Sequence, residues 1–280
     1  MWAWDKQTDR VFPTSPQSVA VEHSFYYADQ LAERGRDPLM LERHFASLES
    51  EISRATSQWL ECIRGGSVGM PVAISEYDRV LAALFIALQF FRTADTRELL
   101  VQFASLKGGT VVSDKGHAVV SERMRRLIHT NALWNGSVLE EFRRRLESAV
   151  WVFARNTSEM PFVTSDNPVA FRRFDHGAWV KLGQFCSGTF VVYPLAPDVI
   201  LYCYPREAPW LVLEPYDSTI STIAFTEKMA ATENTAQPFT ASRFVFSPKD
   251  DFALAKEYAE MVEQPTVYVP FRRNSASEPQ

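Results

Sequence analysis

The segment that most constrains the fold is residues 162–171, in which four polar residues lie between two short apolar runs. Val, Thr and Phe favour extended backbone, whereas Asp and Asn readily hydrogen-bond their own main chain in turns. Pro168 fixes its own φ and moves Asn167 out of the helical region. The segment therefore predicts a strand, a tight turn and a second strand, with Ser165, Asp166 and Asn167 at the bend.

Composition indicates a globular protein and limits its partners. Of the 280 residues, 46% are hydrophobic and 13% aromatic, which is enough for a large buried core. The formal net charge of −5 disfavours a nucleic-acid footprint over the whole surface and leaves a local basic patch open. No apolar run approaches the roughly 18 residues of a membrane-spanning helix, so we expect no membrane association.

The spacing of the cysteines and histidines identifies no metal site, and we assign no cofactor. Cys62, Cys186 and Cys203 lie far apart without a Cys-x-x-Cys pair, and the histidines show no metal-ligand spacing. The first residues lack the basic and apolar regions of a secretion signal. These features together favour a cytoplasmic protein.

Helical periodicity dominates the middle of the chain. Apolar residues from Leu41 to Trp59 step by four and three, which predicts one amphipathic helix. Ser75 and Ser137 begin capping-box patterns, which predict helices over 75–91 and from 137 through Phe153. Further helical patterns cover residues 97–106, 122–133, 218–235 and 252–262.

Strand-forming residues follow residue 156. β-Branched and aromatic runs predict strands at 162–164, 169–171, 189–193, 199–204 and 244–246. We therefore predict one α+β domain over residues 1–272, with a small, mainly antiparallel sheet formed largely by the C-terminal half. Its parts are N-terminal strands and turns over 1–30, a helical section over 38–157, and the sheet with flanking helices over 160–272. Residues 273–280 are expected to form a flexible tail.

The predicted bend carries the first candidate site. Asp166 and Asn167 could position a water, a metal or a substrate amide, although Asx residues before proline often serve only as turn formers. Ser165 has no nearby His and no Gly-x-Ser-x-Gly elbow to make it a nucleophile. Ser-Asp-Asn also occurs in serine β-lactamases, but this chain lacks their Ser-x-x-Lys and Lys-Thr-Gly.

The second candidate site is the polar end of the 75–91 helix. Gln89 and Arg92 share one helix face, and the guanidinium suits a carboxylate or a phosphate. Glu42 and Glu49 lie on the first predicted helix, beside its apolar stripe, and are natural partners for Arg92. The alternatives are a buried salt bridge between two helices and an anion-binding site.

A third cluster is basic. Arg123, Arg125 and Arg126 precede His129, and Arg143, Arg144 and Arg145 follow it. Such clusters attract phosphates, but the glutamates interleaved with them equally predict a solvated face of ion pairs. Asn234 lies in the predicted helical stretch that ends at Thr235. It is either a neutral surface residue or a residue that hydrogen-bonds the edge of a strand.

Several blocks spread over most of the chain carry a family resemblance. They are Trp4-Asp5-Lys6, Ser15-Pro16, Phe25-Tyr26, Leu48-Glu49, Gln89 with Arg92-Thr93, residues 162–169, residues 193–197, and Asn234 ahead of Ala241 and Phe244-Val245-Phe246. Together these blocks resemble the bacterial domain-of-unknown-function family 4238. The resemblance implies a fold and a list of positions, and it joins Glu49, Arg92, Asp166, Asn167 and Asn234 as one cluster. Family members usually begin with a His-x-x-Pro segment, and we expect this sequence to start after the point where that segment would lie.

Two functional hypotheses follow. The first is a hydrolytic enzyme acting on a phosphate-bearing or nucleic-acid substrate, with Asp166 as base or metal-water ligand, Asn167 orienting the substrate and Glu49 holding Arg92. Gln89, Ser165 and Asn234 would join Arg92 in binding that substrate. The second is a non-catalytic binding or protein-interaction module in which the same residues form a structural polar network. Convergence of these residues in an open cleft would favour the enzyme.

Overall fold

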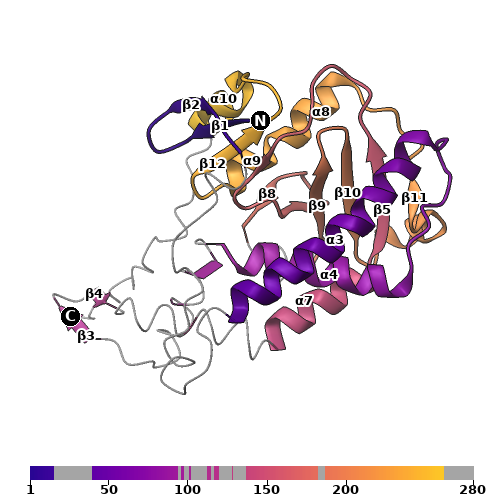
Figure 1. Cartoon of the computed structure of the whole chain (residues 1–280), viewed down its shortest axis with the longest axis horizontal. Helices are drawn as coiled ribbons and strands as arrows, with labels where there is room; N and C mark the ends of the chain where they lie inside the picture. Colours follow the sequence, from indigo (N-terminus) through magenta and orange to yellow (C-terminus); the bar gives the residue numbers. More distant parts are fainter. Residues whose placement is uncertain are drawn as a thin grey trace, which may run out of the picture.

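The computed structural model describes residues 1–15, 40–93, 96–97, 101, 112–114, 117–119, 128, 137–181 and 187–261. These residues form several helices and two larger sheets, in which most strands pair antiparallel (Figure 1). The predicted α+β class is therefore confirmed. Most of the predicted 122–133 and 97–106 helices, the first half of the basic cluster and the 273–280 tail lie outside the described residues.

The central element is a six-stranded sheet. Its strand order is β11-β5-β10-β9-β7-β8, and every pair is antiparallel except β11 with β5. Period-two alternation gives it two different faces, with Val191 and Leu201 on one side and Val192 and Tyr202 on the other. The strands are β5 Val150–Arg155, β7 Ala170–Arg173, β8 Trp179–Val180, β9 Thr189–Ala196, β10 Val199–Tyr204 and β11 Thr219–Ile220.

A four-stranded sheet, ordered β2-β1-β12-β6, joins the two ends of the chain. Its strands are β1 Trp2–Asp5, β2 Arg10–Pro13, β6 Thr164–Ser165 and β12 Phe244–Ser247. The N-terminal hairpin therefore pairs with a strand from the C-terminal part, and β12 pairs in turn with the predicted bend. A separate pair consists of β3 Val112–Asp114 and β4 His117–Val119.

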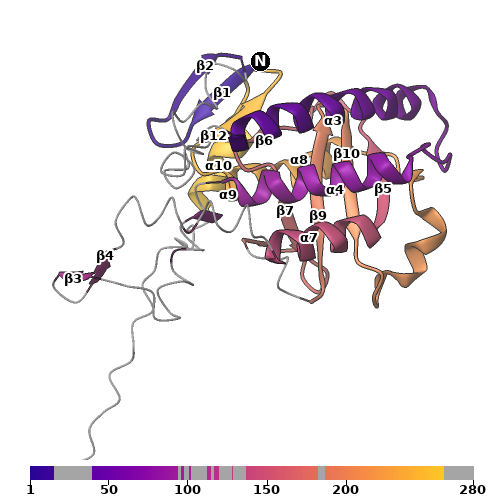
Figure 2. The same cartoon turned by 60° about the horizontal axis from the view of Figure 1, so that its bottom comes forward.

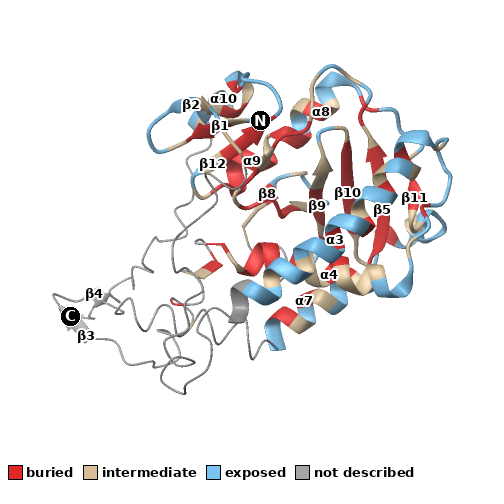
Figure 3. Ribbon diagram, in the orientation of Figure 1, coloured by how far each residue is buried: buried red, intermediate tan, exposed pale blue. Residues whose placement is uncertain are grey.

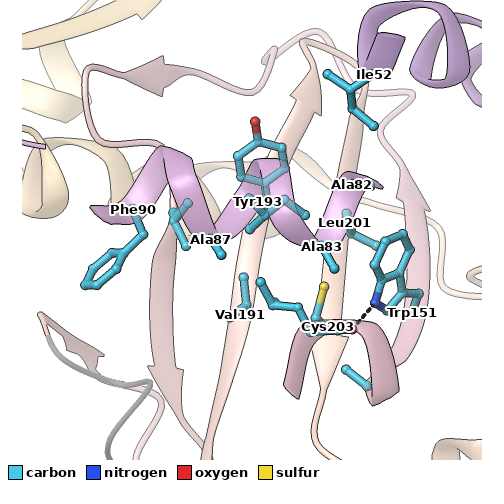
Figure 4. Packing of buried hydrophobic residues seen from close by; sticks show 14 of the residues in the cluster. Ile52, Ala82, Ala83, Ala87, Phe90, Trp151, Val191, Tyr193, Leu201 and Cys203 are labelled. Carbon is cyan, nitrogen blue, oxygen red and sulfur yellow. Dashed lines mark hydrogen bonds between the residues drawn. The ribbon is translucent and has the colours of Figure 1, made fainter. Parts of the chain in front are cut away.

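Three helices cover one face of the six-stranded sheet, namely α3 Met40–Gly65, α4 Glu76–Phe91 and α7 Ser137–Ser148 (Figure 2). Their inner faces are buried and their outer faces exposed (Figure 3). Trp59, Phe90 and Leu146 pack with Trp151 and Leu201 in the main core, part of which is drawn in Figure 4. Burial of this apolar surface is the dominant favourable term in the folding of such a layer.

The opposite face carries a second core. The helices α8 Glu227–Asn234 and α9 Ala236–Thr240 pack there through Ala230, Ala236 and Phe239. The 3₁₀ segment η2 Trp210–Tyr216 brings Trp210 against Phe190. A third cluster joins α10 Ala253–Met261 to the four-stranded sheet.

Two predicted helices are shorter in the structure. The helix from Ser137 ends at Ser148, and β5 starts at Val150 instead of the helix continuing through Phe153. The apolar run from Val150 to Phe153 fits helical spacing, but its β-branched and aromatic residues pack alternately on the two faces of the sheet. The 218–235 prediction is wrong at its start for a similar reason, since β11 occupies Thr219–Ile220 and α8 begins only at Glu227.

Arg79 of α4 ties the helical layer to the sheet. Its Nε donates to the carbonyl of Glu147 at 2.7 Å, and Nη2 donates to the carbonyl of Ala149. Nη2 also pairs with Asp217 at 3.2 Å, and the guanidinium lies 4.7 Å from the centre of the Trp151 ring. One side chain therefore satisfies carbonyls at the end of α7 and connects them to the strands.

We predict that Arg79→Met lowers the free energy of unfolding by about 2–4 kcal/mol, because the carbonyls of Glu147 and Ala149 lose a donor and Asp217 loses one of its charged partners. Urea denaturation of the parent and the variant measures this loss. Arg145→Met is the matched control, since Arg145 pairs with Glu141 on an exposed helix face and such pairs contribute little. Equal losses in the two variants would contradict this role for Arg79.

Candidate functional site

The carboxylate of Asp166 binds the backbone of a distant segment. Oδ1 accepts from the amide of Ser242 at 2.8 Å, and Oδ2 accepts from the amides of Arg243 at 2.7 Å and Phe244 at 3.0 Å. The Asp166 amide itself donates to the carbonyl of Phe244 at 3.1 Å. Asp166 therefore fixes the bend to the residues that lead into β12.

The neighbours of Asp166 form a buried network with α9. Ser165 Oγ donates to Gln237 Oε1 at 2.8 Å and accepts from the amide of Asn167 at 3.2 Å. Asn167 Nδ2 donates to the carbonyl of Thr240, and Gln237 Nε2 donates to the carbonyl of Pro168, both at 3.2 Å. Asn167 Oδ1 is buried and has no hydrogen-bond partner among the described residues. The predicted turn is thus interlocked with a short helix about 70 residues later.

Asn234 holds the strand edge that leads into the bend. Its Oδ1 accepts from the amide of Val163 at 3.0 Å, and its Nδ2 donates to the carbonyl of Pro161 at 2.9 Å. Both ends of the amide are therefore engaged with backbone. Asn234 is therefore buried and bonded to the backbone just ahead of β6, and it is not a neutral surface residue.

The electrostatic surroundings of Asp166 are those of a buried carboxylate held by donors. Burial raises the pKa of Asp166, while its three backbone N–H donors and the charge of Lys6 act to lower it. Lys6 reaches this region by donating to the carbonyls of Pro238 and Ala241, both at 2.8 Å. A general base needs a lone pair directed at its substrate, and these oxygens are directed at backbone amides.

The pair of Glu49 and Arg92 lies on the helical side of the six-stranded sheet. Arg92 Nη1 meets Glu49 Oε1 at 2.7 Å, and the two side chains are 29% and 48% exposed. The predicted partnership is therefore present, at the surface and not as a buried bridge. Burial raises the pKa of Tyr193 to about 12, with the charge of Arg92 acting to lower it and that of Glu49 to raise it. Figure 4 shows the ring of Tyr193 beside α4. Gln89 is buried on the same helix.

Hydrogen bonds and ion pairs link the predicted site residues in two sets. Among the described residues, no hydrogen bond or ion pair joins Glu49 or Arg92 to Ser165, Asp166 or Asn167. A cavity of about 500 Å³ lies between the N-terminal hairpin and α10; none of the predicted site residues lines it, although Ser242, which donates to Asp166, does. The two sets are thus an exposed ion pair and a buried polar network.

Sequence reasoning missed a third polar group, on the opposite face of the sheet. Arg172 Nη1 of β7 meets Glu233 Oε1 of α8 at 2.7 Å, and the Tyr202 hydroxyl is a further hydrogen-bond partner of the buried Glu233 carboxylate. Burial raises the pKa of Glu233, with Arg172 acting to lower it, and burial together with Glu233 raises the pKa of Tyr202. Two sequence features could have pointed to this group. Arg172 lies two residues after Ala170, on the same face of a predicted strand, and Glu233 is next to Asn234.

The remaining candidate features are a metal site, the basic cluster and a membrane-spanning helix. In the part of the chain that the structure describes, no cluster of three His, Cys, Asp or Glu side chains could hold a metal ion. Arg143, Arg144 and Arg145 each pair with a glutamate of the same helix, in agreement with the solvated-face alternative for this half of the basic cluster. None of the described helices combines the length and apolar character that a bilayer crossing requires.

We predict that Asp166→Asn lowers the free energy of unfolding by about 2–3 kcal/mol, because an amide nitrogen would face donors that now meet a carboxylate oxygen. Thermal or urea denaturation measures the change. Asp175→Asn is the control, since Asp175 pairs with Arg173 on an exposed turn and its loss should be hardly measurable. A fully stable Asp166→Asn protein would contradict the structural role.

Glu233 should make stability depend on pH. Its pKa in the folded protein lies above the ordinary value of 4.5 because of burial. Such a group stabilises the fold fully below its unfolded pKa, and this contribution is lost as pH rises through the folded pKa. The unfolding free energy of the parent minus that of Glu233→Gln should therefore fall as pH rises above 4.5. Urea titrations at several pH values test the sign, and a difference that grows with pH would refute it.

The comparisons with known proteins identify a family and no activity. No curated protein and no solved structure matches the chain. The family described as "Protein of unknown function (DUF4238)" matches residues 1–251, which is most of the chain. The resemblance noted in the sequence is thereby confirmed, and the chain belongs to the DUF4238 family.

Proposed function

We propose that the protein binds a small phosphate-bearing ligand through Arg92, and that the bend at Ser165, Asp166 and Asn167 supports the fold without doing chemistry. The observation that carries this proposal is the Arg92–Glu49 ion pair, in which Nη1 and Oε1 are 2.7 Å apart and both side chains are partly exposed. A guanidinium held by one carboxylate retains further N–H groups for an oxyanion.

The surroundings of Arg92 support an anion site. Glu49 engages one terminal nitrogen of the guanidinium, which fixes its orientation before a ligand arrives. The charges of Arg92 and Glu49 both act on Tyr193, whose buried hydroxyl keeps its proton at neutral pH. A small ligand is favoured over nucleic acid because Arg143, Arg144 and Arg145 are already paired with glutamates.

The hydrolytic hypothesis differs in needing a group that moves a proton. Asp166 is poorly suited because three backbone amides occupy its oxygens. Glu49 is the predicted catalytic carboxylate that solvent reaches, and it lies beside Arg92. Hydrolysis by this protein would therefore use Glu49 as base.

Calorimetric titration with inorganic phosphate, pyrophosphate and nucleotides tests the binding proposal. We expect saturable binding of at least one of these probes, weakened about tenfold or more by Arg92→Gln. Arg64→Gln is the matched control, because Arg64 also sits on a helix and pairs with a partly exposed carboxylate, that of Asp198. Binding that is absent, or equally weakened by both variants, would contradict the proposal.

Phosphate release separates the two hypotheses. The binding proposal expects no turnover of these probes by the parent, with or without Mg²⁺ or Mn²⁺. If the parent turns a probe over, Glu49→Gln should abolish the reaction and a folded Asp166→Asn should retain it. Loss of turnover in folded Asp166→Asn would restore Asp166 as the base.

A further inference from the structure

Distant parts of the chain form the cavity between the N-terminal hairpin and α10, elements that lie together in Figure 1. Trp4 lines it from β1, a strand that pairs with β2 on one side and β12 on the other. The buried ring of Trp4 also packs against Phe252, with centroids 6.5 Å apart, so this wall has a fixed position before a ligand arrives. At about 500 Å³, the cavity has the volume of a small-molecule pocket.

The cavity wall carries charges of both signs. Lys6 and Lys256 contribute the positive charges, and Asp9 and Glu260 contribute the negative ones. Two backbone carbonyls, each 2.8 Å away, hold the ammonium group of Lys6. Lys256 meets Asp9 Oδ1 at 2.7 Å and lies 5.8 Å from the centre of the Trp4 ring. Both ammonium groups therefore have defined positions at the wall.

The negative groups retain the capacity to accept hydrogen bonds. Asp9 Oδ1 accepts from Trp4 Nε1 at 2.9 Å and pairs with Lys256, which leaves Oδ2 to accept from a ligand. Lys256 precedes Glu260 by one turn of α10, but its ammonium group is turned to Asp9. In the part of the chain that the structure describes, no hydrogen bond or ion pair engages the side chain of Glu260 or of Gln7. The cavity therefore offers two carboxylates and an amide oxygen as acceptors.

We propose that this cavity binds a free α-amino acid. Gln7, Asp9 and Glu260 are exposed and also line the cavity, so a solute can enter from solvent. The ammonium group of the ligand donates to Glu260 and to Asp9 Oδ2, and its carboxylate lies against the charge of Lys256. Charge-assisted hydrogen bonds of this kind are shorter and stronger than those between neutral groups.

A zwitterion fits this wall better than an ion of one sign. An anion would face the carboxylate of Glu260, and a cation would face the ammonium groups of Lys6 and Lys256. Lys256 and Glu260 are one helical turn apart, a spacing that places Cβ atoms about 5–6 Å from each other. An α-amino acid carries its ammonium group and its carboxylate on the same carbon, so both can reach these two side chains at once.

Calorimetric titration of the parent with the common amino acids, one at a time, tests this site. We expect saturable binding of at least one of them. The amine and the carboxylic acid with the same side chain should each bind at least about tenfold more weakly, because each lacks one of the two charged groups. Arg92→Gln should bind the amino acid like the parent, since Arg92 does not line this cavity.

Glu260→Gln tests the ammonium contact. The variant should be as stable as the parent, because no described partner engages Glu260, and it should bind the amino acid about tenfold more weakly. Glu257→Gln is the matched control. It removes the same charge from an exposed position of the same helix, outside the cavity lining, and should leave the affinity unchanged.

Several results would overturn the proposal. One is the absence of saturable binding of every amino acid, and another is equal affinity for the amino acid and for its matched amine or acid. Loss of binding in Arg92→Gln would move the ligand to the helical face of the six-stranded sheet. Equal affinities of Glu260→Gln and the parent, or equal weakening in Glu260→Gln and Glu257→Gln, would likewise refute the site.

Discussion

The carboxylate of Asp166 is the interaction on which much of this fold depends. It binds three consecutive backbone amides, of Ser242, Arg243 and Phe244, and so fixes the strand-turn-strand bend to the start of β12. Arg243 continues the connection, because its guanidinium pairs with Asp5 of β1 at 2.8 Å. Asp166 therefore joins the bend in the middle of the chain to a C-terminal strand, and Arg243 joins that strand to the N-terminal hairpin. Such long-range contacts close large loops at an entropic cost, which makes each well-formed hydrogen bond important.

If the bend is structural, as we propose, the two arginine–glutamate pairs on the faces of the six-stranded sheet remain to be compared. On the helical face, Glu49 orients Arg92 at a surface that solvent reaches. On the other face, Arg172 and Glu233 are more deeply buried, and Tyr202 hydrogen-bonds Glu233. The exposed pair therefore suits our proposal of a hydrated phosphate ligand better than the buried pair does.

The sequence predicted local features better than long-range partners. Ser75 caps α4 as its pattern indicates, and Asn167 before Pro168 forms the expected bend. The prediction that the helix continues from Val150 to Phe153 is wrong. Four consecutive apolar residues fit the helical and the strand periodicity equally, and only their pairing in the sheet makes them part of β5. The pairing of Glu49 with Arg92 followed from charge on adjacent helices. The donors of Asp166 could not be predicted, because backbone amides 76 to 78 residues away leave no mark in side-chain composition.

Hydrogen exchange of the amides of Ser242, Arg243 and Phe244 tests the central claim most directly. If the Asp166 carboxylate holds all three, they should exchange only through large-scale unfolding, at rates similar to those of the buried amides of β10. If they exchange as fast as free amides while β10 stays protected, the carboxylate is not committed to them. Asp166 would then be available for catalysis, and the structural account of the bend would be wrong.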